Sequence, residues 1–238
     1  TGGNILKYIL TLILINYSLL NAITTTYYMK AAGIKLAKID ILISDREPLI
    51  EIKAKSVKET PLFPQIDNIY RIEHNGEFLP LTYYRIVKQK NVSDEVTVNY
   101  KHNAAEATMS RLSDNSLCRY KTAVGSQDVY SFLAKVISGK ATGSNFPIDA
   151  NGVRWQAKVK KLKAETISTS LGKYPAKHYE ITFQNLTERK MPYIDMVTFN
   201  MLQENIKLNL WVYNNQYAVK ATFKKNGLTS SWELIAVK

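Results

Sequence analysis

Residues 35–44 read KLAKIDILIS, and their alternation of apolar and polar side chains decides the fold class. In an extended strand Ile39 and Ile41 would lie on one face, with Lys38 and Asp40 on the opposite face. The stretch LIEIKAKSV, which follows shortly afterwards, repeats the pattern. Two consecutive strands with one apolar face each indicate a sheet that covers a hydrophobic core.

Turn signals divide much of the remaining chain into further short strands. Asn75-Gly76 separates two of them, because Asn and Gly tolerate the positive φ angles of a tight hairpin. Asp149 to Gly152, Asn214-Asn215 and Asn226-Gly227 give three more turns. The last three strands follow one another as a meander, which closes one edge of a sheet or barrel. The sequence therefore predicts an all-β, mainly antiparallel fold of roughly a dozen strands. We expect a curled sheet or barrel-like single domain over residues 23–238.

One stretch departs from the strand pattern. GSQDVYSFLAKVISGK, residues 125–140, predicts one short amphipathic helix over residues 127–138. Ser126 is the expected N-cap, and Asp128 would lie in the first turn, where the helix dipole favours negative charge. Gly139 is expected to end the helix. The predicted apolar stripe consists of Val129, Phe132, Leu133 and Val136. We expect this helix to cover one mouth of the curled sheet.

Residues 1–22 have the layout of a secretory signal peptide. A lone positive charge at Lys7 precedes an apolar run from Tyr8 to Ile15, and Ala22 offers a small residue for cleavage. The run is shorter than the roughly 20 apolar residues needed to span a bilayer, which favours a cleaved signal peptide. An uncleaved membrane anchor is the alternative. We therefore expect an exported protein in the periplasm of a Gram-negative bacterium. Membrane contact is expected only through the signal segment or peripherally.

The formal net charge of +12 would ordinarily suggest a polyanionic partner. Seven of the 32 basic residues are Arg and the other 25 are Lys. Arg grips phosphate with a bidentate fork, whereas Lys on strands mostly keeps a sheet face in solvent. We therefore expect no nucleic-acid partner, and read the charge mainly as a solvated surface.

No residue pattern in the sequence marks a catalytic or metal centre, and no cofactor is expected. His74, His102 and His178 lack metal-ligand spacing, and His178 with Glu180 is read as part of a solvated strand face rather than a metal pair. Neither a nucleophile elbow nor a Ser-His-Asp order occurs. The acidic residues are too dispersed to nominate a glycosidase pair. The single cysteine, Cys118, excludes an internal disulfide and is expected to be a small buried residue.

The aromatic content is more suggestive, with fifteen Tyr, seven Phe and three Trp. These side chains could line a cavity with apolar bodies and hydrogen-bonding tips, although they also simply suit strands. Our leading hypothesis is a non-enzymatic carrier or binder of an apolar or amphipathic ligand, a lipid or glycan. Two alternatives stay open: an interaction module that docks on an envelope protein partner, and an enzyme acting on glycans. The residues expected to line the ligand site are Tyr130, Phe132, Leu133, Val136, Trp155, Trp211 and Trp232.

The helix start and two later segments carry a family resemblance. Gln127, Asp128 and Ser131 form a Gln-Asp-x-x-Ser helix start, Asp149 to Gly152 form an Asp-x-x-Gly hairpin, and a meander surrounds Trp211. In these features the chain resembles the uncharacterised bacterial family catalogued as domain of unknown function 3108. The resemblance extends over nearly the whole predicted mature chain. It implies an exported, β-rich, barrel-like domain, and it implies no activity.

Overall fold

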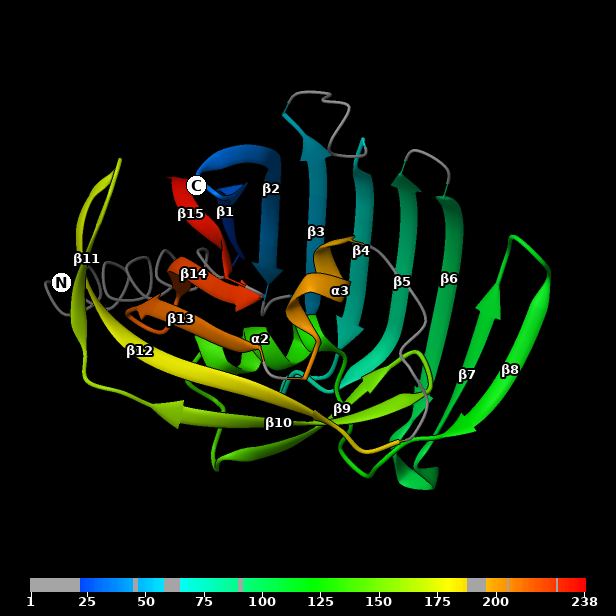
Figure 1. Ribbon diagram of the computed structural model, residues 1–238. Helices are drawn as coiled ribbons and strands as arrows, with labels where there is room; N and C mark the ends of the chain where they lie inside the picture. Colours follow the sequence, from blue (N-terminus) through cyan, green and yellow to red (C-terminus); the bar gives the residue numbers. More distant parts are fainter. Residues whose placement is uncertain are drawn as a thin grey trace, which may run out of the picture.

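The chain folds into one continuous antiparallel sheet that curls around a core and holds a short helix inside (Figure 1). This confirms the predicted all-β class and the curled, barrel-like architecture. The structure, a computed structural model, describes residues 22–44, 47–57, 65–89, 92–187, 196–204, 206–225 and 227–238. The predicted signal segment therefore lies outside the described residues, apart from Ala22.

The first eight strands form an up-and-down series in which each strand pairs with the next. The alternation predicted for residues 35–44 is present, since Ala37 and Ile39 are fully buried while Lys38 is exposed. A single 3-10 turn, η1, joins the sixth and seventh strands. The bounds are β1 (Ala22–Ala31), β2 (Ile34–Ser44), β3 (Leu49–Ser56), β4 (Asp67–His74), β5 (Pro80–Gln89), β6 (Val92–Lys101), η1 (His102–Ala104), β7 (Glu106–Arg111) and β8 (Ser116–Lys121).

The remaining strands continue the sheet from its other side, because the last strand pairs with β1. The predicted meander of the last three strands is confirmed. Asn151-Gly152 and Asn214-Asn215 adopt positive φ at their turns, as predicted, whereas Asn226 lies outside the described residues. The bounds are β9 (Asn145–Ala150), β10 (Val153–Lys161), β11 (Glu165–Thr169), β12 (Gly172–Asn185), β13 (Lys207–Tyr213), β14 (Tyr217–Lys225) and β15 (Leu228–Val237).

The hairpin predicted at Asn75-Gly76 joins β4 to β5, but its geometry differs from the tight turn we expected. The side-chain oxygen of Asn75 accepts hydrogen bonds from the backbone N–H groups of Glu77 and Leu79, at 3.0 and 2.9 Å. This longer connection places the positive φ at the buried Phe78. The Asn side chain therefore organises the turn by accepting backbone hydrogen bonds, not by adopting a left-handed backbone.

In the described ranges two α-helices interrupt the strands. The predicted helix is present as α2 (Val129–Ile137), with Gly139 in the left-handed region after its end. Our prediction of Ser126 as the N-cap was wrong: Asp128 is the cap, and its carboxylate accepts from the first-turn amides. A second helix, α3 (Met196–Met201), was not predicted, because six residues are too few to show a helical period. Within the described ranges neither helix is long and apolar enough to cross a bilayer.

The sheet curls without closing, since its order runs from β8 at one edge to β9 at the other. Figure 1 shows strands β2 to β6 standing side by side, with β10, β12 and β13 running across them at a steep angle. The helix α2 packs against β3 of the first set and against β9, the edge strand that pairs with β10 of the second. The apolar faces of the two sets and of α2 form one hydrophobic core.

Candidate ligand cavity beneath helix α2

Hydrogen bonds attach the start of α2 to strands far apart in the sheet. The backbone of Gln127 bonds to β9: its N–H donates to the Pro147 carbonyl at 3.0 Å, and its carbonyl accepts from the Asp149 N–H at 2.8 Å. Its side-chain amide donates to the Phe78 carbonyl in the β4–β5 connection, at 2.8 Å. Because Gln127 is almost fully buried, these bonds fix the position at which the helix begins.

Asp128 completes this attachment as the N-cap. Its carboxylate accepts from the backbone N–H groups of Tyr130 and Ser131, at 2.8 and 3.1 Å, and from the Ser131 hydroxyl. Burial raises the pKa of Asp128, although these hydrogen bonds favour the ionised form. The Gln-Asp-x-x-Ser pattern is therefore a capping arrangement.

A polar seam links the two open edges of the sheet beside the helix start. We use that name for Asp149 with its three donors: the hydroxyls of Tyr100 and Tyr120, at 3.0 and 2.8 Å, and the Gly152 N–H at 3.0 Å. Tyr120 comes from the edge strand β8 and Asp149 from the opposite edge strand β9, so side chains link edges that no backbone ladder joins in the described sheet. Burial raises the pKa of Asp149 to about 6, despite these hydrogen bonds.

Asp128 and Asp149 form a pair of buried carboxylates, but their surroundings are those of a structural pair. They border a pocket of about 10 Å³ beside Tyr83 and Tyr100, which is room for about one water molecule. Both carboxylates already accept three protein hydrogen bonds. This pocket has no space for a sugar ring, so the pair does not supply the cleft that a glycan-acting enzyme would need.

A second pocket beside α2 has an almost wholly apolar lining. A cavity of about 60 Å³ is enclosed by α2, α3 and strands from both halves of the sheet. Tyr27 contributes its ring, while its hydroxyl donates to the Ala218 carbonyl at 2.8 Å. The described lining residues are Ile23, Thr25, Tyr27, Ile41, Ile43, Ile50, Ile52, Tyr130, Leu133, Ala134, Ile137, Met201, Leu208, Leu210, Gln216, Tyr217, Ala218, Ala221, Phe223 and Trp232.

One side of this cavity opens towards solvent. Ile23, Ile41 and Ile43 on β1 and β2 are only half-buried, as are Leu133 and Ile137 on α2. Gln216 is exposed and Tyr217 half-buried, while the rest of the lining is buried, so these residues together mark a mouth. Partly exposed aliphatic residues gathered around an apolar hollow are a common feature of ligand-binding sites.

The structure brings three of the seven predicted lining residues to the cavity: Tyr130, Leu133 and Trp232. Phe132 instead faces β9 and β12, with its ring centroid 5.4 Å from that of Phe146 and 6.3 Å from that of Phe183.

The other three predicted residues lie elsewhere. Val136 is buried and borders a separate pocket beside Lys161 and Asn215. Trp155 is buried on β10, and Trp211 is a half-buried residue on β13 that stacks on the ring of His178 at 4.4 Å.

The sequence prediction missed that α2 has two apolar sides. Tyr130, Leu133, Ala134 and Ile137 repeat the spacing i, i+3, i+4 and i+7, one position beyond the predicted stripe. A helix with two apolar sides contacts apolar surroundings on both. The apolar residues of this second side are visible in VYSFLAKVI, but the prediction placed the apolar residues of the helix on one face only.

Two further expectations need correction. Cys118 is exposed rather than buried, because β8 is an edge strand with little of the core against it. His178 does not lie on a solvated face: it is buried, with ring nitrogens 2.8 Å from a Glu165 oxygen and 2.9 Å from the Asn209 side-chain oxygen. Among the described residues no group of three metal-ligating side chains converges.

Known proteins share the fold of this chain, but their similarity does not assign it a function. No family model matches the chain. The crystal structure of a β-barrel-like protein of the domain of unknown function DUF1849 from Brucella abortus superposes with a TM-score of 0.58. That match covers 92% of this chain and 98% of the other at 9% sequence identity, so it shows a shared fold alone. The specific family predicted from the motifs is not confirmed, but the chain shares its architecture with an uncharacterised bacterial β-rich protein.

Two weaker matches do not indicate a function. A protein with a YmcC-like fold from Bacteroides fragilis aligns over 92% of this chain with a TM-score of only 0.33 and 11% identity. A polyribonucleotide nucleotidyltransferase of Corynebacterium efficiens is 30% identical over 130 residues, 52% of this chain. The chain spans only 17% of the length of that enzyme.

Proposed function

We propose that this protein is an exported bacterial protein that binds a lipid-like apolar chain in the cavity beneath α2 and has no enzymatic activity. The observation that carries this proposal is the apolar cavity itself, together with its half-exposed aliphatic mouth. Burying apolar surface at such a mouth is favourable by roughly 25 cal/mol per Å² removed from water. The lining favours a lipid over a glycan, because a sugar would leave its hydroxyl groups without partners there.

The size of the cavity sets a condition on binding. At about 60 Å³ it is smaller than the about 150 Å³ cavity that admits benzene in an engineered protein core. A chain of several carbons must therefore displace side chains at the mouth. Leu133 and Ile137 are suited to this, because they are partly exposed and lie on the side of α2 that faces the cavity. We expect the C-terminal half of α2, which carries Leu133 and Ile137, to move, while the hydrogen bonds at the start of the helix stay in place.

Export is the second part of the proposal, and the register of β1 is compatible with cleavage after Ala22. From Ile23, which pairs with Ile43, β1 is paired with β2 along its length. Cleavage after Ala22 would therefore remove the predicted signal segment and leave the strand that borders the cavity mouth essentially whole. A mature chain that starts at Ile23 could fold with the same core.

Native mass spectrometry of the full chain, isolated from cell envelopes without delipidation, tests the proposed function. We expect a species heavier than the protein alone, whose added mass is released as a lipid on collisional activation. A mature N-terminus near residue 23 is expected in the same spectrum. Protein found only at its own mass, in both envelope preparations and preparations incubated with lipid, would contradict ligand binding.

A second candidate function is docking of a protein partner on the edge strand β8. Leu112 and Leu117 on the β7–β8 hairpin are 62% and 74% exposed, and the tip of this hairpin projects at one edge of the sheet (Figure 1). An exposed edge with apolar side chains can pair with a strand of another chain. Crosslinking in cells followed by pull-down should then recover a stoichiometric partner, and Leu117→Lys should abolish its recovery.

A further inference from the structure

A pocket of about 360 Å³ lies beside the last turn of α2. Its volume falls within the range of about 300–1,000 Å³ that is typical of ligand sites. The end of α2, the loop that follows it, strands β10 and β12, and the β13–β14 turn supply the lining. We call this space the basic pocket, and its polar side chains are those of Lys161, Lys177, Tyr179 and Asn215.

The two lysines are on the inner face of the sheet, where β10 and β12 change from apolar to basic residues. On β12 Ile181 is buried, and the next residues on the same face are the half-buried Tyr179 and Lys177. On β10 the corresponding residue after Val159 is Lys161, which pairs with Tyr179. Both lysines therefore border one space from two neighbouring strands.

The lining of the basic pocket leaves this positive charge unbalanced. No acidic residue is among the described residues that border the pocket. The amine of Lys177 donates to the side-chain oxygen of Asn215 at 2.8 Å, and this acceptor is a neutral amide on an exposed turn. A hydrogen bond between ionised partners is about twice as strong as one between neutral groups. An anionic group is therefore a better partner for this amine than Asn215 is.

The end of α2 offsets only part of the charge of the lysines. A helix C-terminus is equivalent to about half a negative charge, which arises from carbonyls without partners. Here the carbonyls of Lys135 and Val136 accept from the backbone N–H groups of Lys140 and Gly139, both at 3.1 Å. Two lysines supply two positive charges, so the pocket as a whole favours an anion.

The basic pocket and the ligand cavity border the same two elements. In the last turn of α2, Val136 lines the pocket and Ile137 lines the cavity. In the β13–β14 turn, Asn215 lines the pocket and Gln216 lines the cavity. Ile137 and Gln216 are among the residues that mark the cavity mouth. The basic pocket is therefore next to the mouth, across the end of the helix.

A contact between the helix end and the turn separates the two spaces. A Cβ at Gly139 would lie 2.8 Å from the side-chain nitrogen of Asn215, so these residues touch. Both are exposed, and a ligand at the mouth can cross this contact from the solvent side. If the Asn215 side chain turns away, it also releases the amine of Lys177. Passage of a ligand and release of a cation thus involve the same side chain.

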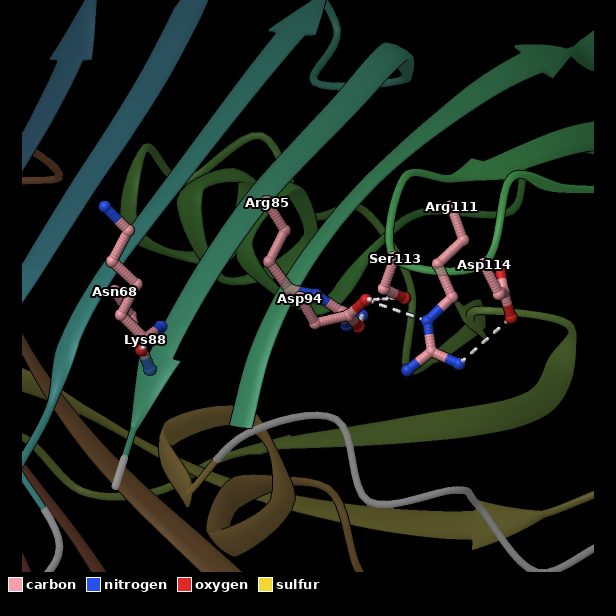
Figure 2. A network of polar contacts seen from close by, with 7 residues as sticks. All are labelled: Asn68, Arg85, Lys88, Asp94, Arg111, Ser113 and Asp114. Atoms are coloured by element: carbon pink, nitrogen blue, oxygen red, sulfur yellow. Dashed lines mark hydrogen bonds and ion pairs between the residues drawn. The ribbon is translucent and has the colours of Figure 1, made fainter. Parts of the chain in front are cut away.

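Buried arginines elsewhere in the sheet are already paired with carboxylates. Asp94 accepts from Arg85 at 3.1 Å and from Arg111 at 2.7 Å. Figure 2 shows that Arg111 also reaches Asp114, which lies 3.8 Å away. Two carboxylates thus accompany two guanidinium groups. We interpret this network as a structural link between β5, β6 and β7, unlike the basic pocket, where the lysines have no acidic neighbour in the described lining.

We propose that the basic pocket binds the phosphate group of an amphipathic ligand whose apolar chain occupies the cavity beneath α2. This inference rests on the proposed function and names the ligand class, a lipid-like phosphate monoester. Such a group carries about −1.5 to −2 charge at pH 7, which matches the two lysines. An ammonium group is a compact point charge that binds phosphate oxygens, whereas a planar carboxylate is better matched by the fork of an arginine.

Isothermal titration calorimetry of the full chain with three probes tests the inference. The probes are decyl phosphate, decan-1-ol and inorganic phosphate, near neutral pH and below the concentration at which micelles form. We expect decyl phosphate to bind more tightly than decan-1-ol, and inorganic phosphate to bind weakly, because it lacks the chain. In the double variant Lys161→Gln/Lys177→Gln the Kd for decyl phosphate should rise about five- to tenfold, the sum expected for two partly exposed ion pairs. The Kd for decan-1-ol should stay within about twofold.

Lys158→Gln/Lys160→Gln is the matched control. Both residues are exposed on the outer face of β10, and their replacement changes the net charge equally. This variant should leave the Kd for all three probes unchanged. Equal loss of decyl phosphate affinity in both double variants would assign the effect to overall charge and overturn the inference. Decyl phosphate and decan-1-ol that bind equally well to the original chain would also overturn it, while leaving the proposed function intact.

Other outcomes separate the two proposals. If neither chain-bearing probe binds, the proposed function itself fails. Inorganic phosphate that binds as tightly as decyl phosphate would show a site for free phosphate and overturn the role of the chain.

Should Lys161→Gln/Lys177→Gln fail to fold, Asn215→Asp provides the second test, because it places a competing carboxylate beside Lys177 on an exposed turn. The Kd for decyl phosphate should then rise severalfold and that for decan-1-ol should not change. An unchanged Kd for decyl phosphate, or an equal rise for both probes, would overturn the inference.

Discussion

The two long sides of α2 face very different surroundings. On the packed side, which we define by Val129 and Phe132, the helix is completely buried against β9 and β12. On the cavity side, defined by Leu133 and Ile137, the side chains are half-exposed and border open space. One element thus provides both core packing and the wall of a binding site. The difference indicates that the packed side stabilises the fold, while the cavity side is free to adapt to a ligand.

The largest effect is expected from truncation on the packed side. Phe132→Ala removes a ring that contacts Phe146 and Phe183 and should reduce the free energy of unfolding by about 3–5 kcal/mol. Leu133→Ala, the neighbouring variant on the cavity side, should cost only about 1–2 kcal/mol, because Leu133 is already partly exposed. Urea denaturation measures both values. Similar losses for the two variants would show that the sides of α2 do not differ.

The next effect concerns the polar seam beside the helix start. The pKa of Asp149 is raised from 3.8 to about 6, so between these pH values the folded state retains a proton that the unfolded state releases. Asp149 therefore favours the folded state most below pH 4, and this contribution is lost as the pH rises through 6. The shift corresponds to about 3 kcal/mol.

Asp149→Asn removes this titration and should flatten the stability profile between pH 4 and 6.5 by about that amount. The raised pKa of Asp128 acts in the same direction and remains in the variant, so some slope should persist. Denaturation at a series of pH values provides the measurement. A profile identical to that of the original chain would mean that Asp149 does not hold its proton in the folded state.

A smaller effect is expected at the end of α2. Gly139 has a φ of 73°, and a Cβ at this position would lie 2.8 Å from the side-chain nitrogen of Asn215. Gly139→Ala should therefore cost about 1–3 kcal/mol through backbone strain and crowding. Gly76→Ala is the control, because nothing lies within 4 Å of its Cβ and its φ is not positive. That variant should stay within about 0.5 kcal/mol, and an equal loss in both would rule out strain at Gly139.

The contrast between the sides of α2 also shows how far sequence reasoning reaches. Alternation in KLAKIDILIS and the turn at Asn214-Asn215 depend on neighbouring residues alone, so the strands and the meander were predictable. The stripe through Phe132 was visible for the same reason. The second apolar side was hidden, because one helical period can be read in more than one way when most residues are apolar.

Contacts between residues distant in the chain could not be predicted. The Tyr120–Asp149 hydrogen bond joins opposite edges of the sheet, and its formation depends on how strongly fifteen strands curl. The pairing of Arg85 with Asp94 depends on strand register, which a one-residue shift would reverse to the other face. Cys118 was misplaced for a related reason: its burial depends on whether β8 has another strand beside it, and that is a property of the whole sheet.

The central claim is that an apolar chain binds between the cavity side of α2 and strands β1 and β2. Calorimetric titration of decan-1-ol into the full chain and into Leu133→Trp tests it most directly, with Leu117→Trp on the exposed edge strand as control. We predict saturable binding at one molecule per chain with a negative heat-capacity change, lost in Leu133→Trp because the larger ring fills the mouth, and retained in Leu117→Trp. Binding that survives in Leu133→Trp, or no binding to any of the three proteins, would contradict the account.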